Sequence, residues 1–245
     1  MMADNTPAIE VKGLTKSFGN QHALDGFDLI VEWGKTLAIF GPNGAGKTTL
    51  IKILASITKP STGEVFINGL NLKDNADFIR SQIGIVSHQV FLYGNLTAHE
   101  NLVFYSRMYD IADYKKRIHQ VVSMLGMQSR LYDRIGTLSR GMQQRFSIAR
   151  CLLHKPSIIL LDEPETGLDQ QAISMLWRAL KEDGSEKLTI VFTSHSLERG
   201  LNTCDNFIIL SKGKIAHQQP SKGLSLVGLQ EIYRDCTGAG SENTK

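Results

Sequence analysis

Short apolar runs, separated by glycine and asparagine, characterise the first forty residues. Residues 8–14 (AIEVKGL), 22–33 (HALDGFDLIVEW) and 35–40 (KTLAIF) are typical of β-strands. The third run is almost wholly apolar, as expected of a strand buried on both faces. It leads into 41–57 (GPNGAGKTTLIKILASI), which predicts a glycine loop followed by a helix.

Further strand patterns occur in the rest of the chain. Residues 59–69 (KPSTGEVFING) predict a turn, a strand and a second turn at Asn68–Gly69. Four more apolar runs predict strands, the last three separated by helical segments: IGIVSHQ (83–89), SIILLD (157–162), LTIVFTS (188–194) and NFIILSKGKIAHQ (206–218).

Between Asn95 and about Leu153 the spacing of apolar residues is helical instead. Thr97 and Glu100 form the pattern Thr-x-x-Glu, which predicts a capping box and a helix reaching about Tyr109. A second helix is expected over 114–125 and a third from about residue 139. Residues 225–236 predict a short helix near the C-terminus.

Strands that alternate with helices indicate an α/β fold with a largely parallel sheet. The helical block lies inside this pattern and is interpreted as an inserted subdomain. We expect one domain over 1–245, with an α/β core at about 1–90 and 156–220, a helical subdomain at about 91–155 and a C-terminal tail at 221–245.

Composition narrows the possible functions. A net charge of +3 in 245 residues, with no basic stripe, argues against direct nucleic-acid binding. Three distant cysteines and seven scattered histidines show no disulfide or metal-ligand spacing. No apolar run approaches the ~20 residues that cross a membrane, and the N-terminus lacks a signal-peptide pattern.

GPNGAGKT (41–48) matches the phosphate-loop pattern G-x-x-x-x-G-K-[ST] in full. Glycines allow the backbone N–H groups to surround phosphates, and the following helix adds its partial positive charge. Lys47 is expected on the β- and γ-phosphates and the Thr48 hydroxyl on Mg²⁺. The expected nucleotide-binding residues are Gly41, Pro42, Asn43, Gly44, Ala45, Gly46, Lys47, Thr48 and Thr49.

IILLDEP (158–164) places two carboxylates at the end of a buried strand. Asp162 is positioned to reach the Mg²⁺ shell, and Glu163 to orient or deprotonate the attacking water. Adjacent carboxylates repel each other unless they share a cation or a proton. A merely structural acidic turn ended by Pro164 is the alternative, which the phosphate loop disfavours.

In this order the motifs resemble those of the nucleotide-binding subunits of ATP-binding cassette (ABC) transporters, over about residues 8–218. The resemblance implies a P-loop NTPase with a RecA-like α/β core, an antiparallel β subdomain and an inserted α-helical subdomain. It makes GPNGAGKT the Walker A loop and IILLDEP Walker B. It implies that Gln89 is the Q-loop glutamine and a ligand of Mg²⁺, and that Asp169 of TGLD (166–169) belongs to the D-loop. It also implies that His195 is the switch histidine and that Phe18 stacks on adenine.

LSRGMQQR (138–145) takes the place of the family's signature, which usually begins LSGGQ. Ser139 and Gly141 are retained, whereas Arg140 and Met142 depart from the pattern. The contacts implied by the family come from the Ser139 hydroxyl and from backbone N–H groups, which tolerate other side chains. Arg140 adds a positive charge near phosphates. We therefore interpret the segment as functional, on a helix whose other face packs in the core.

The resemblance also implies partners. One chain has one phosphate loop and one signature, so a head-to-tail homodimer would enclose two ATP molecules. A transmembrane permease would bind near residues 88–97, placing this chain peripherally on the cytoplasmic face of the inner membrane.

Three segments are similar to the ATPase of cytochrome c maturation (CcmA-like), a haem exporter: residues 91–111, 138–145 with 165–170, and 194–201. None would contact cargo, and drug, lipid or polysaccharide exporters share these motifs. A soluble ABC ATPase acting on ribosomes or DNA fits less well, because the chain has one cassette and no sustained heptads. A non-hydrolysing scaffold is disfavoured by Glu163.

Overall fold

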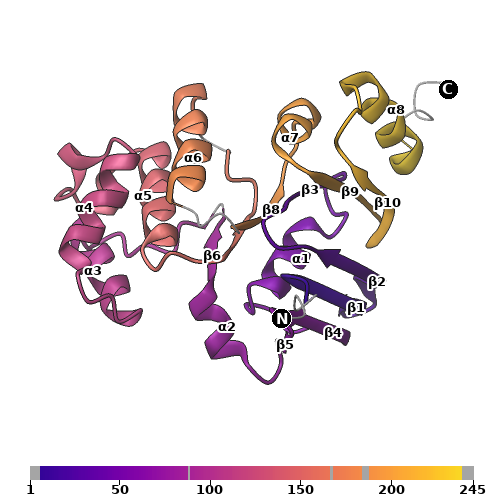
Figure 1. Cartoon of the computed structure of the whole chain (residues 1–245), viewed down its shortest axis with the longest axis horizontal. Coiled ribbons are helices and arrows are strands. Elements are labelled where there is room, and N and C mark those ends of the chain that lie inside the picture. The colour runs from indigo at the N-terminus through magenta and orange to yellow at the C-terminus, as the bar shows by residue number, and fades with distance from the viewer. Residues whose placement is uncertain (1–5, 88, 166–167, 184–187, 239–245) are drawn as a thin grey trace, which may run out of the picture. The chain divides into compact units, whose positions relative to one another are not determined.

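The computed structural model describes residues 6–87, 89–165, 168–183 and 188–238. Its internal contacts divide the chain into two compact units (Figure 1). The first comprises residues 1–80, 160–162 and 189–245, and the second residues 81–159 and 163–188.

An antiparallel sheet of the first unit has the order β2-β1-β4-β5. Ile9 is paired with Val31 on one side and with Ile67 on the other. Asn68 and Gly69 both have positive φ, 52° and 73°, as a two-residue type I′ hairpin requires. The strands are β1 (Ile9–Phe18), β2 (Gln21–Val31), β4 (Thr62–Ile67) and β5 (Leu70–Asn71).

The second sheet has six strands, and those that belong to the first unit are mostly parallel. β3 (Thr36–Phe40) pairs in parallel with both β8 (Thr189–Thr193) and β9 (Asn206–Ser211). β10 (Lys214–Pro220) adds an antiparallel strand beside β9. The order β10-β9-β3-β8 continues to β7 (Ile158–Leu161), whose last two residues belong to this unit. The carboxyl ends of β3 and β8 therefore lie at one edge, and Asp162, which follows β7, reaches this edge because it accepts a hydrogen bond from Thr193 at the end of β8.

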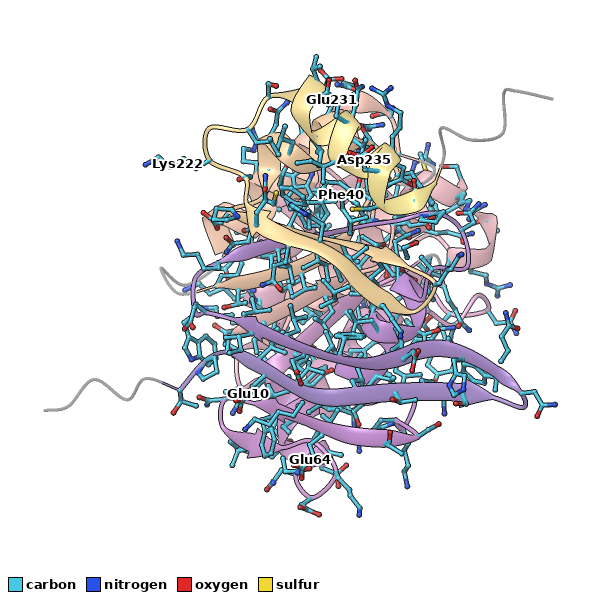
Figure 2. The ribbon with its side chains drawn as sticks, turned by 90° about the vertical axis from the view of Figure 1, so that its right-hand side faces the viewer. Glu10, Phe40, Glu64, Lys222, Glu231 and Asp235 are labelled. Atoms are coloured by element: carbon cyan, nitrogen blue, oxygen red, sulfur yellow. The ribbon has the colours of Figure 1, made fainter. Side chains whose placement is uncertain are left out.

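Helices cover this sheet closely. In α7 (Leu197–Thr203), a Cβ on Gly200 would lie 2.4 Å from the Phe40 ring, so the helix approaches β3 only because this residue is glycine. Phe40 is fully buried in Figure 2, whereas Glu231 and Asp235 of α8 (Leu226–Thr237) face outward. The unit also contains α1 (Lys47–Leu54) and the start of α2 (Ala76–Gln82).

The second unit is mainly helical. The predicted capping box is present, because Thr97 Oγ1 accepts from Glu100 N and the Glu100 carboxylate accepts from Thr97 N. Its long helices are α3 (Ala98–Met108), α4 (Tyr114–Met124), α5 (Arg140–Leu152) and α6 (Gln170–Asp183). Its remaining elements are β6 (Ile83–Val86), the first half of β7, and two 3₁₀ turns at Gln128–Arg130 and Ile135–Thr137.

Every strand and helix that the sequence predicted is present, whereas α2 and the two-residue strand β5 were not predicted, and the run 206–218 forms two strands, β9 and β10. Within α2 only Ile79 is buried, so its apolar pattern is too weak to find from sequence. Cys151 and Cys204 are buried, and burial raises the pKa of the Cys204 thiol to about 11. Among the described residues, no helix combines the length and hydropathy needed to cross a bilayer. The predicted subdomain boundaries stay predictions.

Candidate nucleotide site

The glycine loop after β3 is held by its neighbours. Gly41 has φ of 147°, and a Cβ there would lie 2.3 Å from the Leu210 carbonyl oxygen. Gly46 has φ of 106°, and a Cβ there would lie 2.4 Å from the Ala23 carbonyl oxygen. Other side chains could not occupy these two positions without moving the backbone of the loop or its neighbours.

Lys47 is the first residue of α1 and is buried at 6% exposure. Its ammonium donates to the carbonyl oxygens of Gly41 (2.7 Å) and Pro42 (3.0 Å), so it lies inside the curve of the loop. The N-cap residue, Gly46, offers no side-chain acceptor to the helix. The first N–H groups of α1 therefore lack a side-chain cap, as a phosphate site at a helix start requires.

Asp162 connects the loop to the ends of two strands. The side chain is 2% exposed, and its Oδ1 accepts from Thr48 Oγ1 (3.1 Å) and from Thr193 Oγ1 (3.0 Å). The carboxylate and the Thr48 hydroxyl are oxygen donors of the kind that Mg²⁺ prefers. The structure therefore brings these two predicted Mg²⁺ ligands into direct contact, and the metal site itself stays a prediction. Thr193 was not predicted to belong to it, although it stands at the end of an apolar strand two residues before His195.

His195 follows β8 in a short turn. The Ser194 hydroxyl donates to the Ser196 carbonyl (3.2 Å) and accepts from Ser196 N (3.1 Å). Ser196 in turn caps α7. His195 is exposed, and it stands two residues beyond the threonine that binds Asp162. His195 therefore lies in the turn after the carboxyl end of β8, close in sequence to the contact between Thr193 and Asp162.

Phe18 ends β1, also in the first unit. Its side chain is 58% exposed, and Lys16 Nζ lies 4.9 Å from the centre of its ring. An aromatic ring this exposed is available to stack on a base, as the resemblance implies.

The remaining predicted residues belong to the second unit. Gln89 is exposed and follows a turn built by the buried Ser87, whose hydroxyl donates to Gln89 O (2.9 Å) and accepts from Gln89 N (3.2 Å). Glu163 is half-buried and has φ of 51°. Residues other than glycine seldom adopt this conformation, and it occurs preferentially at functional sites.

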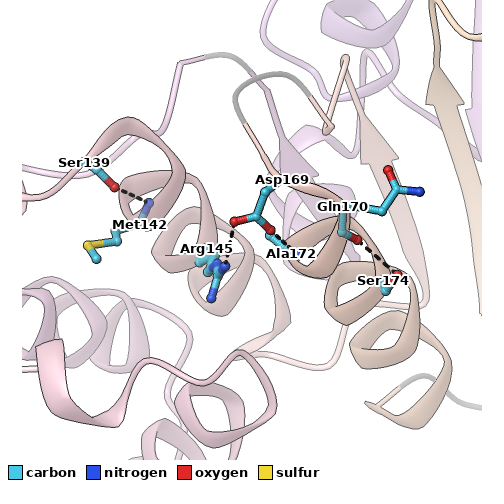
Figure 3. Close-up of polar contacts among 7 residues, drawn as sticks. All are labelled: Ser139, Met142, Arg145, Asp169, Gln170, Ala172 and Ser174. Carbon is cyan, nitrogen blue, oxygen red and sulfur yellow. Dashed lines mark hydrogen bonds and ion pairs between the residues drawn. The ribbon is translucent and has the colours of Figure 1, made fainter.

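The signature segment begins α5. Ser139 is the N-cap residue and its hydroxyl accepts from Met142 N (3.3 Å) (Figure 3). Arg140 occupies the first helical position with an exposed side chain, and Gly141 lies within the helix without positive φ. The altered residues therefore leave a regular helix start, with Ser139 exposed.

Asp169 of the predicted D-loop caps α6. Its Oδ1 accepts from Ala172 N (2.7 Å), and its Oδ2 lies 3.8 Å from Arg145 Nη2 of the signature helix (Figure 3). Arg145 was not predicted to contact this aspartate, because the two residues are 24 positions apart in the sequence. Residues 166 and 167 of TGLD, like His88 of the Q-loop stretch, lie outside the described residues.

The sequence-predicted site is thus distributed over both units. The first holds the phosphate loop from Gly41 to Thr49, with Asp162, His195 and Phe18. The second holds Gln89, Glu163, Ser139–Met142 and Asp169. The loop with its enclosed lysine, joined to a buried aspartate at the end of β7, two strands away in the sheet, defines the class of P-loop NTPases.

Comparison with known proteins agrees with this class and narrows it. The sequence profile of the ABC transporter family matches residues 24–166, more than half of the chain. The chain belongs to this family, as the ATP-binding subunit of an ABC transporter, and the matched domain is an ATPase.

Curated relatives include the linearmycin resistance ATP-binding protein LnrL of Bacillus subtilis, 31% identical over 84% of this chain and 67% of its own length. The Nod factor export ATP-binding protein I of Rhizobium meliloti is 33% identical over 89% of this chain and 66% of its own. The chain therefore spans about two thirds of these relatives. Among solved structures, the ATP-binding cassette MJ0796, a dimer bound to ADP and Pi, matches with a TM-score of 0.80 and 29% sequence identity. The match covers 88% of this chain and the whole of the MJ0796 chain.

Proposed function

We propose that this chain uses ATP hydrolysis to drive export through a separate transmembrane permease. The contact of Thr48 and Thr193 with Asp162, beside a loop that already encloses Lys47, is the observation that carries the proposal. These contacts support a phosphate-and-metal site in the first unit, because side chains that the protein itself holds in position cost less to order on binding.

Each residue has a role in this proposal. Lys47 exchanges its bonds to the loop carbonyls for bonds to the β- and γ-phosphates. Thr48, Asp162 and Gln89 would hold Mg²⁺, which supplies charge neutralisation on the phosphates. Glu163 accepts the proton of the attacking water, and His195 contacts the γ-phosphate. Phe18 stacks on the adenine.

Two copies of the chain complete the site. Ser139 and the backbone around Gly141 would contact the γ-phosphate held by the other copy's loop, with Asp169 at the same interface. The dimeric MJ0796 cassette, 29% identical, supports a homodimer. ATP then stabilises the dimer and hydrolysis releases it, so the nucleotide acts as a switch.

The proposed location is peripheral, on the cytoplasmic face of the inner membrane, where the permease binds the segment around residues 88–97. For the cargo we propose the haem-handling exporter of cytochrome c maturation, which three sequence segments of this chain resemble. The names of the two curated relatives support the alternative, an exporter of drugs, lipids or polysaccharides.

Glu163→Gln tests the chemistry of the proposal. Removing the general base is expected to lower ATP hydrolysis by ~10²–10⁴, about 3–5 kcal/mol of barrier, while ATP binding survives. ATP should then trap the homodimer on a sizing column. Glu165→Gln is the matched control, because Glu165 accepts a bond from Trp177 Nε1 at 3.2 Å and should leave turnover near wild type. A Glu163→Gln variant that stays monomeric with ATP would contradict the proposed dimer.

The same variant identifies the partner. Tagged Glu163→Gln protein is pulled down with ATP from its own membranes in mild detergent, and the co-purifying proteins are identified by mass spectrometry. A permease together with haem-handling assembly proteins would support the cytochrome c proposal. A permease without them would retain the exporter and reject haem. Recovery of only ribosomal or DNA-bound proteins would refute transport.

A further inference from the structure

A buried arginine at the far end of the signature helix contacts the segment that carries Gln89. Arg150, near the C-terminal end of α5, is only 6% exposed. Its Nη2 donates to the carbonyl oxygen of Ile85 in β6 (2.6 Å). Its guanidinium lies 5.5 Å from the ring centre of Phe91. Arg150 therefore contacts the chain four residues before Gln89 and two residues after it.

Tyr105 of α3 reinforces the second contact. Its ring centre lies 5.3 Å from the Arg150 guanidinium, and its hydroxyl donates to the Phe91 carbonyl oxygen (2.6 Å). Phe91 has φ of 51°, a conformation that persists only where surrounding contacts impose it. The two contacts of Phe91, to Arg150 and to Tyr105, provide that constraint.

Helix α5 also packs tightly against β6 next to the bond between Arg150 and Ile85. A Cβ on Gly84 would lie 2.5 Å from Cys151 Sγ, so only glycine permits this approach. Burying a guanidinium is unfavourable unless its donors and its charge are satisfied. Here the Ile85 carbonyl and two aromatic rings contact it, while its Nε has no hydrogen-bond partner among the residues that the structure describes. An apolar residue would fill the space without that cost, which points to a role beyond packing.

We propose that Arg150 is a positioning residue that fixes the Q-loop, here Ser87 and Gln89–Phe91, to the signature helix. The helix that begins at Ser139 thereby also determines where Gln89 lies. A nucleotide that contacts Ser139 would therefore influence the position of Gln89, because one regular helix of thirteen residues joins the two ends. The inference rests on the proposed function, in which Ser139 and Gln89 both act during ATP turnover.

Hydrogen exchange tests the positioning directly and without nucleotide. Arg150→Lys keeps the charge but loses the planar, stacking guanidinium. We expect the backbone amides of Gln89 and Phe91 to exchange about 10-fold faster in this variant. Tyr105→Phe, which removes only the hydroxyl bond to Phe91 O, should act in the same direction but less, and it guards against a folding failure of the arginine variant.

Arg117→Lys is the matched control. Arg117 is also 6% exposed and also binds α5, donating to the carbonyls of Leu152 and Leu153. The Arg117→Lys variant should have lower thermal stability, while hydrogen exchange at the backbone amides of Gln89 and Phe91 should stay unchanged. If Arg117→Lys accelerates exchange there as much as Arg150→Lys does, general loosening of α5 explains the result and the proposal is wrong.

A double-mutant cycle supplies the kinetic test. We expect Arg150→Lys to lower kcat by about 10-fold or more, with little change in the Kd of a fluorescent ATP analogue, because a misplaced group costs rate rather than binding. In a Gln89→Ala background the same change should have no further effect on kcat. Multiplicative losses would overturn the proposal. If Gln89→Ala alone leaves kcat unchanged, the proposed role of Gln89 fails instead, and the exchange result still decides whether Arg150 positions the segment.

Discussion

Helices α1 and α5 both begin at a segment expected to bind phosphate, but their first turns are built differently. α1 follows a left-handed glycine and receives no side-chain cap, while its loop is fixed by close approach to Leu210 and Ala23. α5 follows Ser139, which adopts an extended backbone and caps its own helix through Met142 N. The first helix start is shaped by tertiary packing, and the second by a local hydrogen bond.

The difference has consequences for ligand binding. At α1 the helix start has no side-chain cap and the Lys47 ammonium lies inside the loop, so both favour an anion, and this end is suited to hold a nucleotide by itself. At α5 the Ser139 hydroxyl already satisfies one N–H group. Neither helix has an acidic residue in its first turn, and α5 instead begins with Arg140. A cation there opposes the helix dipole until a phosphate arrives, so the signature is suited to a ligand delivered by another copy.

The largest effect that separates the two helix starts is expected from Lys47→Ala. Removing the ammonium should lower kcat/KM for ATP by at least about 10³-fold, or about 4 kcal/mol, because no other group replaces its charge in the loop. Steady-state ATPase assays and binding of a fluorescent ATP analogue measure the loss. Lys52→Ala, on the exposed face of the same helix, should behave as wild type. Normal turnover in Lys47→Ala would overturn the assignment of the loop.

The next effect, on stability, tests whether packing shapes the phosphate loop. Gly46→Ala should lower the free energy of unfolding by about 3 kcal/mol or more, since the new Cβ meets both a strained φ and a backbone oxygen. Gly44→Ala is the control in the same loop, because its φ is 77° but no atom lies within 4 Å of the new Cβ. It should cost about 1 kcal/mol. Urea unfolding without nucleotide compares them, and equal losses would show that conformation alone, not packing, requires Gly46.

Ser139→Arg tests whether the altered signature is used. A long cation in place of the capping hydroxyl is expected to obstruct the partner's nucleotide and lower kcat about 10²-fold, or about 3 kcal/mol. Binding of ATP to the isolated monomer should remain, since the chain's own loop is untouched. Ser139→Ala, which loses only the cap, should cost about 1 kcal/mol of stability. Wild-type turnover in Ser139→Arg would mean that the substituted signature has no part in hydrolysis.

The same contrast explains what sequence could and could not predict. The capping box at Thr97 and the helix start at Ser139 depend on neighbouring residues, so local motifs predicted them. The phosphate loop was also predicted from its local motif, but its packing against Leu210 and Ala23 was not. Thr193 and Arg150 were missed, because Asp162 is 31 positions from the first and Ile85 is 65 positions from the second. A buried arginine in the segment SIARCLL resembles any polar residue on an amphipathic helix. Only the folded chain reveals what it contacts.

The smallest expected effect concerns the far end of α5, where His154 stacks on Tyr109 with ring centres 4.0 Å apart. Burial lowers the pKa of His154 from 6.5 to about 4. The unfolded chain therefore binds a proton that the folded chain does not, and stability is lost as pH falls from about 6.5 towards about 4. Between pH 7 and pH 5 this contribution is about 2 kcal/mol.

His154→Phe should keep the stacking and remove this dependence. Urea unfolding at pH 7 and pH 5 would then show a loss about 2 kcal/mol smaller in the variant than in the wild type. His119→Phe, at an exposed position of α4, is the control and should leave the wild-type difference intact. An unchanged difference in His154→Phe would show that protonation of His154 does not oppose folding.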